Sequence, residues 1–181
     1  MNILFTICGR AGSKGIKNKN VKSFLEVPLA LYALSAIQLY VNENEKINYD
    51  IVVNTDSQEL INIIVNSKII PVEVIHRRAN LSGPFIAKID VIKDSLFQME
   101  ERRKLKYDYV IDLDLTSPLR QIEDIKNLVD KMQKTNCDLV LSVVKSRRNP
   151  YFNMLKQSET KEGYEMVIKT SFVARQQESS P

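Results

Sequence analysis

Three glycines and several cationic side chains follow an apolar run near the start of the sequence. The run covers residues 3–8 (ILFTIC), and residues 9–20 after it are GRAGSKGIKNKN. Glycine lets the backbone approach an anion closely and turn its N–H groups toward it, while arginine and lysine add charge that amides lack. This order of residues is typical of a phosphate-binding loop after a β-strand. Taken alone, the loop is equally compatible with an exposed turn rich in glycine and lysine.

Two well-known phosphate-binding motifs do not match this loop. The P-loop needs a second glycine five residues after the first, but Lys14 stands there when counting from Gly9, and Lys17 when counting from Gly12. The dinucleotide motif needs an early pair of glycines separated by one residue, whereas the glycines here are three residues apart. The loop therefore predicts phosphate binding by neither of these motifs.

A second polar segment, residues 112–120 (DLDLTSPLR), follows another apolar run that begins at Tyr109. Carboxylates at the end of a strand beside phosphates often hold Mg²⁺, which makes Asp112 and Asp114 candidate metal ligands. Arg120 is suited to contact an acidic substrate. The alternative for the whole segment is a capped turn between a strand and a helix.

Apolar runs of strand length alternate with helical patterns along the chain. In the helix expected at 85–104, Ile89, Ile92, Leu96 and Met99 recur at helical spacing and are expected in the core. The alternation predicts an α/β fold with a mainly parallel doubly wound sheet, in which ligands bind at the carboxyl ends of the strands. We expect strands at 3–8, 49–55, 72–75, 109–115 and 138–144, helices at 27–40, 58–67, 85–104 and 122–135, and a hairpin strand within 163–170.

Composition limits the classes of protein that the chain can be. With 181 residues, 44% of them hydrophobic, the simplest organisation is a single globular domain. The net charge of +4 is compatible with nucleic acid or with a polyanionic small molecule, since the cationic residues are scattered. No secretory signal or membrane span is evident, so a cytoplasmic location is expected. Cys8, Cys137 and the lone His76 predict free thiols and do not suffice for a structural zinc site.

Both polar segments resemble motifs of the CMP-sialic acid synthetase family, the cytidylyltransferases that activate acidic nonulosonic sugars. Residues 9–16 (GRAGSKGI), with Lys19-Asn20 in step, resemble the family signature A-R-x-G-S-K-G-I followed by K-N. Residues 112–120 resemble Q-P-T-S-P-L-R, or D-V-T-S-P-L-R in the legionaminic acid branch, which the variant CGRAGSKG also favours. The resemblance covers essentially the whole chain and implies a Rossmann-like nucleotidyltransferase fold with three α/β/α layers.

The resemblance also implies roles for individual residues. Arg10 and Lys19 would be catalytic, because they would neutralise charge on the triphosphate. Nucleotide binding is expected from Gly9, Arg10, Ala11, Gly12, Ser13, Lys14, Lys19, Asn20 and Arg77. Sugar binding is expected from Asp114, Thr116, Ser117 and Arg120, and from Arg175 and Gln176 in a segment that resembles the family motif R-Q-Q; Asp112 or Asp114 would bind the metal.

The sequence departs from the family pattern in two places. Residues 54–56 (NTD) resemble S-T-D with Asn54 in place of serine, and Asp56 is expected either to cap the next helix or to contact a ligand. Arg78 occupies the position of a proline, and segment 81–84 (LSGP) lacks the aspartate that the family has there. This part of the nucleotide pocket is therefore expected to differ from that of the family.

The implied reaction is attack by the anomeric hydroxyl of an α-keto acid sugar on the α-phosphorus of CTP, with Mg²⁺ or Mn²⁺ as cofactor and no covalent intermediate. The sugar would be N,N'-diacetyllegionaminic acid or sialic acid, for a surface glycan or flagellin, and the enzyme a homodimer. Because the family has a dimerising arm and a late D-x-D metal pair, residues 1–181 are expected to be a domain truncated at the C-terminus, with a partial arm from about 145 and little activity. The alternatives are an idle nucleotide-binding fragment and a basic nucleic-acid-binding domain.

Overall fold

The computed structural model describes residues 1–13, 16–83, 86–135, 137–143, 148, 154–158 and 162–168. The chain divides into two compact units, residues 1–140 and 141–181, and each is described by itself. Lys14, Arg175 and Gln176, which the sequence assigns to the site, lie outside the described residues.

A parallel sheet forms the centre of the first unit. It has four strands in the order β5-β4-β1-β6, with β1 at Asn2–Gly9, β4 at Asn48–Thr55, β5 at Glu73–His76 and β6 at Tyr109–Asp112. Strand β1 pairs with β4 along its whole length and with β6 from Ile3 to Thr6. Since all pairs are parallel, the carboxyl ends of the strands meet at one edge of the sheet, as predicted.

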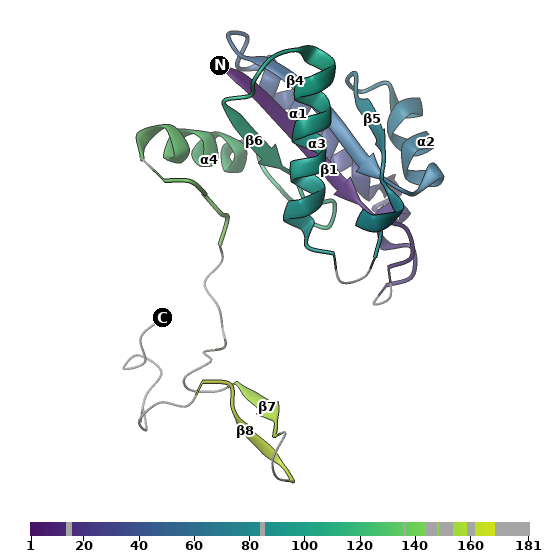
Figure 1. The fold of residues 1–181 in the computed structure, drawn as a ribbon, viewed down its shortest axis with the longest axis vertical. Helices are drawn as coiled ribbons and strands as arrows, with labels where there is room; N and C mark the ends of the chain where they lie inside the picture. The colour runs from purple at the N-terminus through teal and green to yellow at the C-terminus, as the bar shows by residue number, and fades with distance from the viewer. Residues whose placement is uncertain are drawn as a thin grey trace. The chain divides into compact units, whose positions relative to one another are not determined.

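Helices cover both faces of this sheet, which confirms the three-layer α/β/α architecture. The face that carries Ile3, Phe5 and Ile7 packs against α1 (Leu29–Asn42), α2 (Gln58–Ser67) and α4 (Ile122–Lys134). The opposite face, with Leu4 and Val52, packs against α3 (Lys88–Arg103), which lies in front of the sheet in Figure 1. Alternate residues of a strand point to opposite faces, so the apolar run of β1 supplies both cores.

Polar residues at the helix starts explain where two helices begin. The Ser57 hydroxyl accepts a hydrogen bond from the Leu60 N–H at 3.2 Å, so it caps α2, which spans 58–67 as predicted. Gln121 and Asp124 form a capping box at the start of α4, in which the Gln121 N–H donates to the Asp124 carboxylate at 2.8 Å. Helix α3 begins after Ala87 without a side-chain cap.

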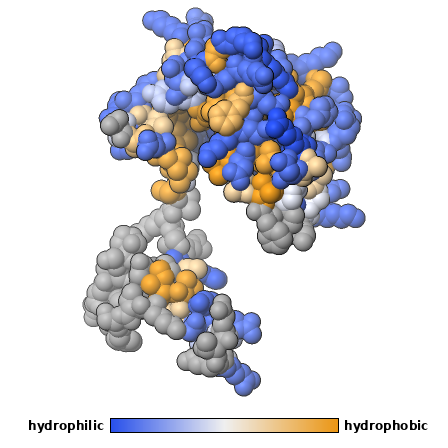
Figure 2. Space-filling view, in the orientation of Figure 1, coloured by the Kyte–Doolittle hydropathy of each residue, from blue (hydrophilic) through white to orange (hydrophobic). Residues whose placement is uncertain are grey.

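The prediction for the buried face of α3 was wrong at Ile89, whose side chain is 53% exposed. Val91, Ser95 and Met99 form the buried face instead, and Ile92 and Leu96 are half-buried. The buried asparagine Asn54 draws Ser95 inward through a hydrogen bond, and a polar residue of this kind is invisible to a search for apolar periodicity. In Figure 2, hydrophilic side chains cover most of the outer face over α3.

Two other expected elements differ from the structure. The segment 138–143 forms no strand, and its side chains Leu139, Leu141 and Val143 are 67, 67 and 87% exposed. Apolar alternation favours a strand only where a neighbour pairs with it, and none of the described strands does. Val27–Pro28 is strand β3, paired with β2 (Ser23–Phe24), rather than helix, because Pro28 adopts an extended conformation as the cap of α1.

In the second unit, the described residues include an antiparallel pair, β7 (Leu155–Gln157) and β8 (Tyr164–Met166). Strand β8 lies within the hairpin strand predicted at 163–170. The Lys156 ammonium and the Glu165 carboxylate lie 3.4 Å apart across the pair. Among the described residues of both units, no helix has the length and apolar character needed to cross a membrane.

The two-residue turn between β2 and β3 is strained, which gives a first prediction. Leu25 and Glu26 have φ values of 47° and 67°, a region that costs residues with a Cβ about 1–2 kcal/mol. Glycine tolerates this region, so Glu26→Gly should raise the free energy of unfolding by about 0.5–1 kcal/mol in urea titrations. Glu45→Gly is the matched control, because Glu45 is an exposed turn residue that is not among those with positive φ. Equal destabilisation by both changes would contradict the assignment of strain.

Candidate functional site

A cleft of about 240 Å³ opens at the carboxyl edge of the sheet. The cations Arg10, Lys19, Arg77 and Lys88 line it, together with the carboxylate Asp114. Cations outnumber carboxylates on its described walls, so the cleft suits an anionic ligand. Its other lining residues include Ser13, Asn20 and Thr116, so seven of the residues predicted for the site meet in one cavity: Arg10, Ser13, Lys19, Asn20, Arg77, Asp114 and Thr116.

The loop after β1 is folded back on itself by side-chain hydrogen bonds. The Asn20 amide donates to the Arg10 carbonyl at 3.0 Å, and the Lys19 N–H donates to the Ser13 hydroxyl at 3.2 Å. These bonds bring Arg10 and Lys19 to the same cleft although they are nine positions apart in the sequence. Gly12 has a φ of 65°, a conformation for which glycine is the suitable residue.

Asp56 has a role that neither sequence interpretation included. Ser57, rather than Asp56, caps α2. The Asp56 carboxylate instead accepts a hydrogen bond of 2.6 Å from the Ala11 N–H, which ties the loop to the end of β4. The expectation that Asp56 caps the helix is therefore wrong, and this main-chain N–H is already engaged within the protein.

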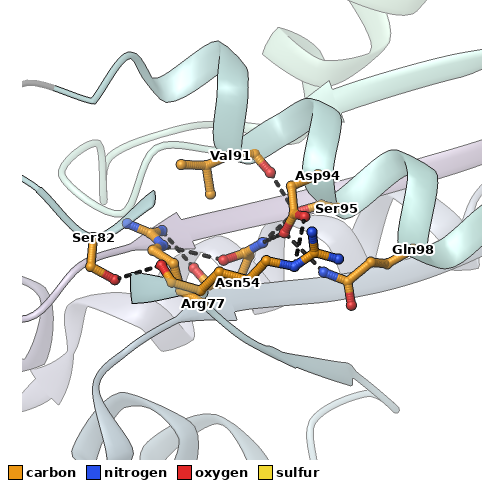
Figure 3. A network of polar contacts seen from close by, with 8 residues as sticks. Asn54, Arg77, Ser82, Val91, Asp94, Ser95 and Gln98 are labelled. Atoms are coloured by element: carbon orange, nitrogen blue, oxygen red, sulfur yellow. Dashed lines mark hydrogen bonds and ion pairs between the residues drawn. The ribbon is translucent and has the colours of Figure 1, made fainter. Parts of the chain in front are cut away.

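Asn54 connects Arg77 to α3 through a network of polar contacts (Figure 3). Its buried amide nitrogen donates to the Ser95 hydroxyl at 3.0 Å and to the Asp94 carboxylate at 3.2 Å. Arg77 donates to the side-chain oxygen of Asn54 at 3.2 Å and to its carbonyl at 2.6 Å. Burial lowers the pKa of Arg77, but an arginine stays charged. The guanidinium is thus held in place on the wall of the cleft.

Arg78, which stands where the family has proline, joins the same network. Its guanidinium lies 3.6 Å from the Asp94 carboxylate, and the Ser82 hydroxyl donates to its carbonyl at 3.1 Å. The short helix η2 (Ala79–Leu81) follows.

Lys88 and Asp114 line the cleft beside β6, and Asp112 contacts Lys88 from the end of that strand. The Lys88 ammonium lies 2.5 Å from Asp112 and 3.7 Å from Asp114. Burial disfavours the charged form of Lys88, but the charges of Asp112 and Asp114 and the hydrogen bond to Asp112 together outweigh it, so the pKa of Lys88 is raised. Burial likewise acts to raise the pKa of Asp114, while Lys88 and the hydrogen bonds from Thr116 outweigh it and leave this pKa lowered. The ion pair is therefore charged at neutral pH.

Lys88 was missed by the sequence analysis, although a signal for it exists. It precedes the buried residues Val91, Ser95 and Met99 by three, seven and eleven positions, so it lies on the inward face of α3. The predicted face of Ile89, Ile92, Leu96 and Met99 has Lys88 at its edge, whereas the observed face of Val91, Ser95 and Met99 has it near the centre.

Arg120 and Ser117 contact the turn that carries Asp114 and are not among the residues that line the cleft. One Arg120 N–H group donates to the Asp114 carbonyl at 3.3 Å, and the Ser117 N–H donates to the same oxygen at 3.4 Å. Arg120 Nη1 is buried and has no hydrogen-bond partner among the described residues. Burial lowers the pKa of Arg120.

The candidate metal ligands form a pair rather than a complete cluster. Among the described residues, no group of three or more His, Cys, Asp or Glu side chains is placed to hold a metal ion. Mg²⁺ does not need three such side chains. It commonly binds one or two carboxylates and completes its coordination shell with water and substrate phosphates. Asp112 and Asp114 already share one cation, the Lys88 ammonium, so the donor set fits a divalent ion that arrives with phosphates.

The chain matches the family described as "Cytidylyltransferase" over residues 4–179. "Post-translational flagellin modification protein B" of Campylobacter coli is 38% identical over 160 residues, which cover 88% of this chain and 65% of that protein. "CMP-N,N'-diacetyllegionaminic acid synthase" of Campylobacter jejuni is 35% identical over the same shares. This chain therefore spans slightly less than two thirds of the length of these relatives.

A solved structure supports the fold. The structure of CMP:2-keto-3-deoxy-manno-octonic acid synthetase complexed with CTP matches with a TM-score of 0.53 and 16% identity, over 74% of this chain and 48% of that one. At this identity the likeness concerns the fold alone, and it confirms the predicted Rossmann-like nucleotidyltransferase architecture.

The Asn54 network gives a prediction on stability. Asn54→Ala leaves Arg77 and the α3 side chains without a buried partner, so the free energy of unfolding should fall by about 2–3 kcal/mol. Urea unfolding followed by circular dichroism measures the change. Asn80→Ala, at an exposed position, is the control and should stay within about 0.5 kcal/mol of the parent protein. A similar small loss in both variants would show that the network does not hold the two elements together.

The thiol of Cys8 gives a prediction on pH. Burial, with Asp112 as the next cause, raises the pKa of Cys8 to about 12, so at pH 8 only about 10⁻⁴ of it is thiolate. A Cys137→Ser variant, in which Cys8 remains, should react with Ellman's reagent at least about 100-fold more slowly than an unfolded cysteine. Its rate should rise about tenfold per pH unit up to pH 10. Cys8→Ser, which keeps the exposed Cys137, is the matched control, and fast labelling in both variants would contradict the prediction.

Proposed function

Since the chain belongs to the cytidylyltransferase family, we propose that it transfers CMP from CTP to an acidic nonulosonic sugar and releases pyrophosphate. The observation that carries this proposal is the convergence of Arg10 and Lys19 on one cleft through the hydrogen bonds of the folded loop. A triphosphate is the polyanion that such a pair of cations fits. Membership of the family makes a nucleic-acid-binding domain the less favoured function.

In the proposed reaction, the anomeric hydroxyl oxygen of the sugar forms a bond to the α-phosphorus of CTP. The bond from that phosphorus to the bridging oxygen breaks, pyrophosphate leaves, and the hydroxyl proton passes to solvent. Arg10 and Lys19 stabilise the charge that builds on the phosphate oxygens, because their positions are fixed before the substrate arrives. Gly9, Ala11, Gly12 and Ser13 shape the backbone around them, and Arg77, which lines the same cleft, contacts the nucleotide.

The sugar binds, in this proposal, on the side of the cleft formed by Asp114 and Thr116. Ser117 and Arg120 support it by holding the turn. The name of the relative that is 35% identical favours N,N'-diacetyllegionaminic acid over sialic acid, and the flagellin protein B is consistent with a role in flagellin or surface glycosylation. A cytoplasmic homodimer remains part of the proposal.

Mg²⁺ or Mn²⁺ completes the proposed site. Asp112 and Asp114 would hold the ion, which when bound supplies positive charge to the phosphates.

Calorimetric titration of the chain with CTP, ATP and GTP in the presence of Mg²⁺ tests the nucleotide site. We expect selective CTP binding, which Arg10→Ala and Lys19→Ala each weaken about 10- to 100-fold through loss of a charge-assisted contact. Lys17→Ala is the matched control, because Lys17 is exposed two residues before Lys19 and should change affinity less than about twofold. Equal effects of Lys17→Ala and Lys19→Ala would overturn the assigned cleft.

Pyrophosphate release in the presence of a panel of nonulosonic acids tests the reaction itself. Release with diacetyllegionaminic acid that exceeds release with sialic acid supports the proposed sugar. Selective CTP binding without release would instead identify a nucleotide-binding but catalytically idle chain.

A further inference from the structure

Lys88 lies at an unfavourable place in its helix. It is the first residue of α3, and Ala87 before it provides no side-chain cap. The positive end of a helix dipole lies at the N-terminus, so an ammonium group there is disfavoured unless something compensates it. Its compensation is the pair Asp112 and Asp114, at 2.5 and 3.7 Å. A lysine that is disfavoured by the helix dipole, and whose charge is balanced by carboxylates at a cleft, is a candidate for a functional role.

The two carboxylates are arranged to present one oxygen each to the same cation. Asp112 Oδ1 accepts a hydrogen bond of 2.9 Å from the Thr6 hydroxyl, and Asp114 Oδ1 accepts bonds of 3.2 and 3.1 Å from Thr116 N–H and Oγ1. The remaining oxygens, both Oδ2, face Lys88 Nζ. Threonine bonds therefore fix the orientation of both carboxylates, whichever cation lies between them.

We propose that Lys88 is the resident counter-ion of the Asp112–Asp114 pair and that a divalent cation must displace its ammonium to bind there. Lys88 is a positioning residue in this role, because it acts through the carboxylates. This inference rests on the proposed function, because a divalent cation that arrives with a nucleotide is needed only if the cleft binds a nucleoside triphosphate. Lys88 would then offset one of the two negative charges of the pair, and so reduce its repulsion of anions, until that cation binds.

Competition for the pair predicts that removal of the lysine strengthens metal binding. Lys88→Met preserves the length and the apolar stem of the side chain but removes the charge. The partly exposed ion pair of Lys88 must be broken before a divalent cation binds. A pair of this kind typically changes the affinity for that cation by about fivefold. Mn²⁺ binding to the whole chain, followed by electron paramagnetic resonance of the free ion and without nucleotide or sugar, should therefore be about fivefold tighter in Lys88→Met.

Three further variants make the test specific. Lys93→Met removes an exposed lysine of the same helix and should bind Mn²⁺ like the parent chain, as should Lys88→Arg, which keeps the charge. Asp112→Asn in the Lys88→Met background should abolish the gain. If Lys88→Met loses the native circular dichroism spectrum, Lys88→Gln replaces it, because glutamine also removes the charge and is a good helix former.

Unchanged Mn²⁺ affinity in a folded Lys88→Met or Lys88→Gln chain would overturn the inference, and so would an equal gain in Lys93→Met. This titration contains neither CTP nor sugar, so its outcome is separate from that of the nucleotide titration. A gain in Mn²⁺ affinity without selective CTP binding would support the role of Lys88 and count against the proposed enzyme function.

Discussion

Strand β1 ends at Gly9, where two core leucines leave no room for a side chain. The position of the cleft depends on this close packing. A Cβ atom at Gly9 would lie 2.7 Å from both the Leu60 and the Leu115 side chains. Both leucines belong to the core under α1, α2 and α4, so hydrophobic packing determines where the loop leaves the sheet. From this fixed start, the bonds of Ser13 and Asn20 return the loop to the cleft. The positions of the cations are therefore a consequence of core packing.

Each carboxylate at the same edge has a partner within the protein. Asp56 accepts the Ala11 N–H, and Asp112 and Asp114 face Lys88. An uncompensated carboxylate at this edge would repel an anionic substrate. Because each of the three has a donor or a cation opposite it, Arg10 and the other basic residues dominate the charge that the cleft presents. The arrangement allows acidic residues to lie beside the cationic residues of the proposed triphosphate site.

Local signals in the sequence predicted much of the fold, whereas contacts between distant segments decided the rest. The apolar runs and the helical pattern located β1, β4 and α2, and parallel pairing then placed the motifs at one edge of the sheet. The inward face of α3 was not predictable from apolar spacing, because a hydrogen bond from Asn54, 41 residues away, brings the polar Ser95 into the interior. The role of Asp56 likewise depends on an N–H group 45 residues away. The segment 138–143 shows the converse case, since a strand-like pattern forms no strand without a paired neighbour.

The departures from the family pattern strengthen the links to α3. Asparagine in place of serine at position 54 has both a donor and an acceptor, so it reaches Ser95 and Arg77 at once. Arg78 in place of proline adds a cation 3.6 Å from Asp94 of the same helix. Helix α3 therefore supports both walls of the cleft, one through this network and the other through Lys88. A cation that displaced Lys88 would therefore act on the same helix that carries Asp94 and Ser95, the α3 residues of the network that holds Arg77.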